Sequence, residues 1–499
     1  MLLVLLLGLP LLGGAAVALG RGRPLAAWTA VGANGATLAL GLDLAVRVVH
    51  TGPVTGPGGV LRCDSLSAFM VVVIGSIALL ASWLGVRVIA AEREGPRAGR
   101  ATIYGVLVQA FVATMLLAVL AANVGVLWVA VEATTIVTAF LVGHRRTKGS
   151  LEASWKYIVI CSVGIALAFL GTVLVYLATL HAGGHSAHAL DWTSLMAHAR
   201  HLDPGVMKLA FALLVLGYGT KVGLAPMHSW LPDAHSQAPA PVSALMSGVL
   251  LTVAFYAILR FKAVTDLAVG PHFSRTLLVI VALLSLAVAA SLLLTQRDYK
   301  RMLAYHSIEH MGLIALGAAA GIPLAIAAVL LHILGHGLAK SVLFLTSGEI
   351  MTSEGTSQID GVRSLLARRP TLGGIFGIGL IALLGFPPFS LFASELGMIR
   401  AEFQVGLGWA AALAMVAMVA IFIAVIGHAR HMLLGRVAIP APPALPAPAT
   451  AALPAAGPPA APASVTAPLV GGLVLCAAIG VFAWPLTGLL QSAAHVVAP

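Results

Sequence analysis

The chain has 499 residues, of which 60% are hydrophobic and only 9% are charged, with a mean hydropathy of +1.02. Soluble domains carry about 25% charged residues, so this composition excludes an ordinary globular protein and predicts an all-α, polytopic membrane protein. The formal net charge is +11, but the Lys and Arg residues lie in short loops between apolar runs, which favours a role in membrane topology over nucleic-acid binding. The three cysteines lie far apart, and we predict neither a metal site nor a disulfide framework from them.

Apolar runs divide the chain into about 14 expected transmembrane helices, because each span needs roughly 20 apolar residues. The continuous ones are expected near residues 2–19, 25–49, 66–90, 103–121, 124–142, 155–180, 242–261, 277–294, 301–320, 323–345, 410–434 and 469–490. The other two are discontinuous: the seventh is interrupted at Pro226, and the twelfth begins near Leu372, is interrupted at 385–388 and resumes through Glu395. We expect the first run to be a retained helix rather than a signal peptide, since no basic residue precedes it.

The two interrupted helices suggest an internal repeat, because paired broken helices in corresponding positions are typical of inverted repeats with ion sites near the bilayer midplane. We therefore divide the chain into helices 1–3 (residues 1–101), a first five-helix repeat of helices 4–8 (102–264), a second repeat of helices 9–13 (275–436), an Ala/Pro-rich linker (437–468) and a C-terminal helix 14 (469–499). Two unrelated Gly/Pro kinks are the alternative. The linker composition favours an extended polyproline spacer without a chemical role.

Basic residues are concentrated in the loops that follow odd-numbered helices. These loops hold Arg21, Arg23, Arg93, Arg97, Arg100, Arg145, Arg146, Lys148, Arg297, Lys300, Arg301, Arg363, Arg368, Arg369, Arg430 and Arg436. By the positive-inside tendency these loops are cytoplasmic, so we expect a protein of the cell (inner) membrane with both termini on the extracytoplasmic side.

The expected seventh helix contains a lysine, Lys221, at a depth where the chain should still be inside lipid. A cation there costs roughly 2.5–3.5 kcal/mol on insertion scales, and such residues usually line an ion path. The break at Pro226 points the same way, because an interrupted helix is tolerated only where the freed backbone faces protein or water. Glu132, near the middle of the fifth helix, is expected to pair with Lys221, and His228 and His235 follow the break.

Further ionisable residues continue this polar axis through the tenth, eleventh and twelfth helices. They are His306, His310, His332, His336, Lys340 and Glu395. The three on the eleventh helix are spaced i, i+4, i+8, so they share one face and span about 12 Å. Histidine exchanges protons near neutral pH, and a buried lysine is brought toward the same range, so the set is a candidate proton pathway.

Each of these residues also has a structural alternative. A single membrane histidine could equally be a packing residue bonded to a carbonyl group, and Lys221 with Glu132 could be a static ion pair. A separate loop contains His181, His185, His188, His198 and His201. Because their spacing is irregular and no cysteine accompanies them, we interpret this loop as solvated rather than metal-binding.

The helix-seven segment, Lys221 with LAPMHSWLPDAHSQAPAPVSALMSGVLL, resembles the antiporter-like proton-translocating subunits shared by respiratory complex I, membrane-bound hydrogenases and Mrp-type antiporters. KRMLAYHS at 300–307 and HILGHGLAKSVLFLTSG at 332–348 extend the resemblance, and Glu309-His310-Met311 with PPFSLFASE is most similar to the hydrogenase-4 component F branch. The resemblance implies a 14-helix core with two inverted five-helix repeats. It assigns Glu132, Lys221, Lys340 and Glu395 to the family's helix-five, -seven, -eleven and -twelve ionisable positions.

One departure from the family pattern concerns the eighth helix, where many complex I members place a lysine and this chain has Thr252. The central relay would then depend on His228, His306, His332, His336 and bound water. The resemblance implies a non-catalytic, proton-translocating subunit of a redox-driven complex. It would lack cofactors of its own, since three scattered cysteines cannot supply a Cys₄ cluster set, and would have other membrane subunits and a soluble redox arm as partners. The alternatives are an Mrp-type cation/proton antiporter subunit working without redox chemistry, or a purely structural scaffold.

Overall fold

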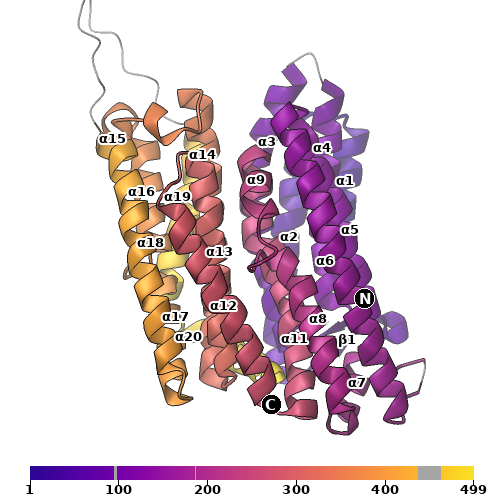
Figure 1. Ribbon diagram of the computed structural model, residues 1–499. Helices are drawn as coiled ribbons and strands as arrows, with labels where there is room; N and C mark the ends of the chain where they lie inside the picture. Colours follow the sequence, from indigo (N-terminus) through magenta and orange to yellow (C-terminus); the bar gives the residue numbers. More distant parts are fainter. Residues whose placement is uncertain (95–97, 186, 436–461, 499) are drawn as a thin grey trace, which may run out of the picture.

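The computed structural model describes residues 1–94, 98–185, 187–435 and 462–498 (Figure 1). The first half contains α1 (Leu2–Leu19), α2 (Pro24–Thr51), α3 (Ser65–Glu94), α4 (Ala98–Leu120), α5 (Val124–Val142), α6 (Lys148–His181), α7 (Trp192–His198), α8 (Pro204–Val222), α9 (Trp230–Gln237), α10 (Ala240–Leu245) and α11 (Leu251–Val269). The second half contains α12 (Pro271–Leu293), α13 (Tyr299–Ala320), α14 (Pro323–Glu354), α15 (Leu365–Arg368), α16 (Pro370–Leu383), α17 (Ser390–Gln404), α18 (Gly408–Leu434), α19 (Ala463–Val481) and α20 (Trp484–Val497).

Other regular structure is confined to short pieces. A hairpin of β1 (Val54–Thr55) and β2 (Arg62–Cys63) precedes α3, and Val54 pairs with Cys63. The 3-10 turns are η1 (Pro57–Gly59), η2 (Gly143–Arg145), η3 (Ala199–His201) and η5 (Ile359–Gly361), and a π-helical segment, η4 (Met246–Leu250), joins α10 to α11. The described residues therefore confirm an almost entirely helical protein.

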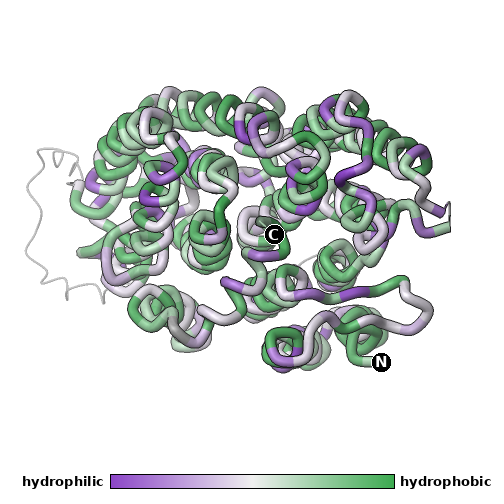
Figure 2. Tube along the Cα trace, turned by 90° about the horizontal axis from the view of Figure 1, so that it is seen from below, coloured by the Kyte–Doolittle hydropathy of each residue, from purple (hydrophilic) through white to green (hydrophobic). Residues whose placement is uncertain are grey.

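The helices have the length and composition of membrane spans. Among the described residues, 12 helices are long and apolar enough to cross a bilayer. Seen from below, the tube is hydrophobic along most helical turns (Figure 2). Two of these segments, Ala240–Val269 and Pro323–Glu354, are buried inside the protein throughout their most apolar windows, whereas only 33% of the corresponding windows of Leu2–Leu19 and Gly408–Leu434 is buried. The polytopic membrane prediction is confirmed, and the buried helices form the centre around which the others pack.

The two halves of the chain lie side by side. In Figure 1, α12 to α18 form one group and α1 to α11 form the other. The halves meet where α13 contacts α9 and where α14 contacts α3 and α10. The last two helices return to this junction, since α19 and α20 both pack against α14 and α3. The long central helix α14 is therefore enclosed by elements from both ends of the sequence.

Two expectations about element boundaries are wrong. The loop expected to hold His181, His185, His188, His198 and His201 contains a short helix, α7, and a 3-10 turn, η3. Its histidines 181, 185, 188 and 201 are exposed as expected, whereas His198 is half-buried. The linker was expected to run to Pro468, but α19 already begins at Ala463 and includes this proline. Proline removes the hydrogen bond to the carbonyl four residues earlier. The Trp83 indole supplies a substitute by donating to the Ser464 carbonyl at 3.1 Å. The rest of the expected linker, residues 436–461, lies outside the described residues.

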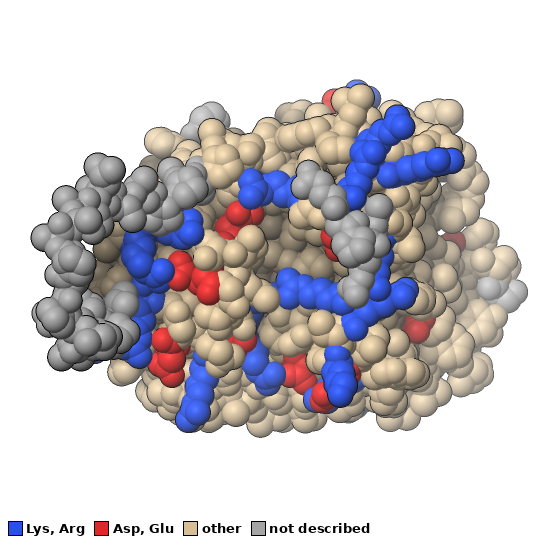
Figure 3. Space-filling view, turned by 90° about the horizontal axis from the view of Figure 1, so that it is seen from above, with Lys and Arg blue, Asp and Glu red and all other residues tan. Residues whose placement is uncertain are grey.

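Charged side chains gather at one end of the bundle. Viewed from above, Lys and Arg side chains are spread across the face at the end of the bundle where α3 ends and α15 lies, among residues that are mostly uncharged (Figure 3). Acidic residues are interspersed with them, as in the Arg368–Glu354 pair at 2.7 Å. This arrangement agrees with the loop asymmetry in the sequence, and we refer to this end as the basic face.

Candidate functional site

A first polar cluster surrounds Lys221 in the last turn of α8. The side chain is fully buried, and its ammonium donates to the Tyr157 hydroxyl of α6 at 2.9 Å and to the Thr134 hydroxyl of α5 at 3.3 Å. The same ammonium lies 5.1 Å from the centre of the Tyr157 ring, a cation–π distance. The lysine is therefore held by neutral groups from two other helices.

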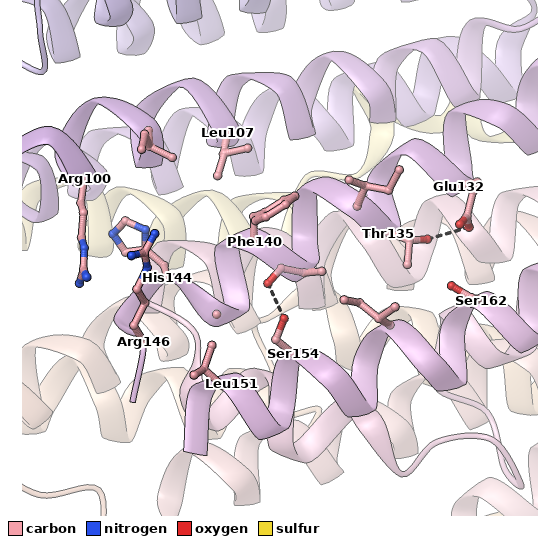
Figure 4. A pocket seen from close by; sticks show the side chains of 15 residues that line it. Arg100, Leu107, Glu132, Thr135, Phe140, His144, Arg146, Leu151, Ser154 and Ser162 are labelled. Atoms are coloured by element: carbon pink, nitrogen blue, oxygen red, sulfur yellow. Dashed lines mark hydrogen bonds between the residues drawn. The ribbon is translucent and has the colours of Figure 1, made fainter. Parts of the chain in front are cut away.

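The expected charge pair between Glu132 and Lys221 is not formed in this structure. Glu132 is half-buried and accepts a hydrogen bond from Thr135 at 3.0 Å, while Lys221 binds Thr134. Glu132 and Thr134 are two positions apart on α5, so their side chains point about 200° apart around the helix. Glu132 instead lines a cavity of about 680 Å³ between α4, α5 and α6 (Figure 4).

The chain is interrupted after Lys221, between α8 and α9. Gly223 ends α8 with a φ of +81°, and a Cβ atom there would lie 2.3 Å from the Leu231 side chain, so glycine is needed at this turn. The freed backbone finds partners: the Trp230 indole donates to the Thr220 carbonyl at 2.8 Å, and the Ala225 amide donates to the Ser285 hydroxyl at 2.9 Å. The interruption expected near Pro226 is thus present.

The two histidines that follow the break have different positions. His228, in the turn between α8 and α9, is half-buried, and among the described residues no side-chain hydrogen bond or ring contact joins it to another predicted site residue. His235 on α9 is fully buried, stacks on Phe344 of α14 at 4.9 Å, and has no protein hydrogen-bond partner on either ring nitrogen among the described residues. Two unpartnered buried nitrogens are costly, so His235 keeps the capacity for two further hydrogen bonds in the interior.

Two further lysines lie near His235. Lys340 of α14 is fully buried, donates to the Leu303 carbonyl, and lies 6.0 Å from the Phe344 ring. Lys300 of α13 is also buried, and its ammonium donates to the Ser236 and Ala238 carbonyls at 2.9 Å each, at the C-terminal end of α9. Sequence reasoning assigned Lys300 to a basic loop and missed it as a site residue, because only the fold shows that the side chain turns inward.

A second polar cluster is made by histidines of α13 and α14. His310 and His332 share a hydrogen bond of 2.9 Å between Nδ1 and Nε2, and the other nitrogen of His332 lies 2.9 Å from the Ser394 hydroxyl. His306 stacks on His310 at 4.8 Å, and His336 lies 5.0 Å from His310. All four imidazoles are buried, so the structure brings together the histidines that the sequence predicted as a row.

Two carboxylates complete this cluster. Glu309 lies 2.6 Å from His306, and Glu395 of α17 is 9% exposed beside the break between α16 and α17. Both line a cavity of about 380 Å³ that extends past Pro387 to α18. Gly385, with a φ of +69°, permits this approach, because a Cβ atom would lie 2.3 Å from a Glu395 oxygen. Sequence reasoning did not select Glu309, although its i, i+3 spacing from His306 could have identified it.

Thr252, at the position where the family resemblance leads us to expect a lysine, is hydrogen-bonded within its own helix. The Thr252 hydroxyl donates to the Gly248 and Val249 carbonyls of its own helix, so it offers no titratable group to the interior. One helical turn earlier, in the π-helical segment, Ser247 lies 2.9 Å from Ser307 of α13. π-Helical turns are frequent at functional sites, and this hydroxyl pair is the polar contact between α13 and that segment.

The arrangement suits stepwise proton transfer better than metal chemistry. His310, His332 and Glu395 do each place a ligand atom within 4.8 Å of the others, which is a spacing a metal ion could use. However, His310, His332 and Ser394 already form a hydrogen-bonded chain, and hydrogen-bonded imidazoles pass protons directly or through one water.

At the basic face a third cavity, of about 280 Å³, lies beside Arg87, Glu349 and Pro239, near the end of α9 that Lys300 contacts.

Comparison with known proteins gives a consistent result. Residues 121–423 match the family described as NADH:quinone oxidoreductase/Mrp antiporter, transmembrane. The chain is 40% identical to a hydrogenase-4 component F homolog of Methylacidiphilum infernorum (isolate V4) over 351 residues, covering 70% of this chain and 73% of that protein. It is 32% identical to hydrogenase-4 component B of Escherichia coli (strain K12), over 67% of this chain and 50% of the relative, so it spans about half of that protein's length.

Among solved structures, the chain superposes on a chain of the membrane-bound sulfane sulfur reductase, an archaeal respiratory membrane complex. The TM-score is 0.85, the sequence identity 25%, and the match covers 99% of this chain and 97% of the other. The fold seen here is therefore shared along nearly the whole chain.

Proposed function

Because this chain belongs to the NADH:quinone oxidoreductase/Mrp antiporter family of transmembrane proteins, we propose that it is a proton-translocating, antiporter-like subunit of a redox-driven respiratory complex of the membrane-bound hydrogenase kind. It holds no redox centre in this proposal, and electron transfer takes place on a soluble arm bound to neighbouring membrane subunits. The observation that carries the proposal is the series of buried ionisable groups that runs from the basic face to the Glu395 cavity.

In the proposed pathway, protons enter at the cavity beside Arg87 and Glu349 and reach Lys300 and His235. They continue through Lys340, then through the imidazoles of His336, His310 and His332, and leave by Glu395 and its cavity. The hydrogen-bonded step from His310 to His332 needs no water, whereas the step between the tilted rings of His336 and His310, whose centres are 5.0 Å apart, needs one bridging water.

Lys221 has the controlling role in this proposal. Its bonds to Tyr157 and Thr134 stabilise the ammonium without a counter-charge, so movement of the Glu132 carboxylate toward it would strengthen its hold on a proton. A change at Glu132, on the flank of the bundle, would thereby alter the charge at the centre. His228 takes no part in the pathway.

We extend the proposal to topology. Adding α13 and the joined pair α16–α17 to the 12 apolar spans gives 14 crossings. The breaks after α8 and α16 then fall in corresponding positions of two inverted five-helix repeats, within residues 102–264 and 275–436. With the basic face on the cytoplasmic side of the cell (inner) membrane, both termini lie on the extracytoplasmic side.

The second candidate is a subunit of an Mrp-type cation/proton antiporter, which the family match favours equally because it covers both groups. Sodium-dependent pH changes in vesicles that lack any electron donor would support it. Redox-dependent proton uptake with no sodium requirement would support the first candidate.

The deciding experiment replaces Lys221 with alanine in the assembled complex, reconstituted in proteoliposomes with its electron donor. Lys208→Ala is the matched control, since Lys208 lies on the same helix but is exposed at its start. We expect Lys221→Ala to abolish proton pumping while copurification of partner subunits is unchanged, and Lys208→Ala to pump normally. Normal pumping by Lys221→Ala would refute the proposal.

A further inference from the structure

The cavity beside Glu132 is a long lateral groove on the flank of α4, α5 and α6, which the proposed pathway does not use. Its walls are mainly apolar and include Ile103, Leu107, Ile136, Phe140 and Ile158. Its volume is about 680 Å³, and Ile136 and Phe140 are 59% and 63% exposed, so the groove opens to the side of the bundle. An apolar groove of this kind needs an apolar occupant.

The two ends of the groove differ in charge. Arg100, His144 and Arg146 lie at one end in Figure 4, and Glu132 lies at the other. Arg146 is exposed, and it follows η2 at the basic face, whereas His144 is buried and lies 2.7 Å from Glu92. A ligand that fits both ends has an anionic head beside the arginines and an apolar tail directed toward Glu132.

The length of the groove matches one leaflet of a bilayer. From Gly143 to Glu132 the chain descends 11 residues of helix, which is about 17 Å at 1.5 Å per residue. Half of a hydrocarbon core of about 30 Å is about 15 Å. A lipid with its head group at the Arg100 and Arg146 level therefore has a tail that ends near Glu132.

We propose that the groove between α4, α5 and α6 binds one anionic phospholipid of the leaflet at the basic face, with its phosphate at Arg100 and Arg146 and an acyl chain extending to Glu132. The arginines supply charge attraction, which is worth roughly a factor of five in affinity for each basic residue near an anionic lipid surface. The acyl chain covers Ile136 and Phe140 and separates the Glu132 carboxylate from the water at the basic face. Binding depends on the groove alone and does not require that the protein pumps protons.

The test measures lipid retention by native mass spectrometry of the detergent-purified complex, titrated with dioleoyl phosphatidylglycerol or dioleoyl phosphatidylcholine. We expect one tightly retained phosphatidylglycerol and preference over phosphatidylcholine. Replacing both arginines (Arg100→Gln with Arg146→Gln) should weaken phosphatidylglycerol binding by roughly 25-fold. Lys148→Gln, which removes a nearby exposed charge outside the groove, should leave binding unchanged.

A second pair of variants tests the tail without changing charge. Ile136→Trp fills the groove, whereas Val129→Trp places the same side chain on an exposed position of α5 outside it. We expect only Ile136→Trp to release the lipid. The proposal is overturned if phosphatidylglycerol and phosphatidylcholine are retained equally, or if Lys148→Gln weakens binding as much as the double arginine replacement does. It is also overturned if Ile136→Trp releases a neighbouring subunit while lipid retention is unchanged. The last result would mean that protein covers the groove.

Discussion

Replacing Gly385 with alanine tests how closely the α16–α17 break must approach Glu395. A Cβ atom at this position would lie 2.3 Å from a Glu395 oxygen, about 1 Å inside ordinary van der Waals contact. The φ of +69° adds a left-handed penalty of roughly 1–2 kcal/mol. The clash itself is relieved at small cost, because the contacted atoms are the carboxylate end of a flexible side chain that borders a cavity. We therefore expect a loss of about 1–2 kcal/mol in the free energy of unfolding, with the Glu395 carboxylate displaced from the His310–His332 pair.

The assay compares Gly385→Ala with Gly374→Ala, a glycine of α16 around which no atom would approach a new Cβ within 4 Å. Thermal unfolding in detergent and proton pumping in proteoliposomes are measured for both variants. Gly374→Ala should be as stable as the parent protein or slightly more stable, because alanine is the better helix former. If Gly385→Ala unfolds and pumps like the parent protein, then Glu395 is not held against this turn.

Three other variants address separate features. Lys300→Met should abolish pumping, while Lys148→Met, on an exposed basic residue, should not; equal activities would remove Lys300 from the pathway. Asp64→Asn leaves Arg260 buried without its carboxylate partner, 2.6 Å away, and should cost about 3–5 kcal/mol in unfolding experiments. Burial disfavours the Asp64 carboxylate, but the charge and hydrogen bonds of Arg260 outweigh burial and hold the pKa of Asp64 below its ordinary value. The pair's contribution should thus persist at neutral pH and disappear on acidification below about pH 4, a dependence that Asp64→Asn should lack. Trp83→Phe removes the donor to the first turn of α19 and should lower stability by about 0.5–1.5 kcal/mol, the range of an ordinary hydrogen bond; an unchanged unfolding temperature would contradict that role.

Much of the fold could be predicted from hydropathy, because a bilayer requires long apolar helices wherever the chain crosses it. The bounds of α1, α5 and α13 differ little from the expected runs. The start of α19 was missed because proline normally interrupts a helix, and the compensating bond from Trp83 comes from a residue nearly 400 positions away. Such long-range partners leave no local pattern in the sequence.

The site was predictable where spacing along one helix decides it. The histidines of α13 and α14 share faces at i, i+4 intervals, and they do meet in the interior. The expected pairing of Glu132 with Lys221 was wrong, because a contact between these residues depends on the rotation of α5 relative to α8, which spacing along one helix does not determine. Lys300 was missed for a related reason: a lysine at the start of a helix is usually solvated, and only the neighbouring end of α9 gives it an interior partner.

The attachment of Lys300 to the end of α9 links a titration to a displacement. Its ammonium ties down two carbonyl oxygens of the short helix that follows the interruption after Lys221. A neutral amine attracts those oxygens less strongly than an ammonium does, so giving up the proton loosens the anchorage of α9. By thermodynamic reciprocity, a displacement of α9 away from Lys300 must make the ammonium lose its proton more readily. Movement of this short helix is thereby coupled to proton release at Lys300.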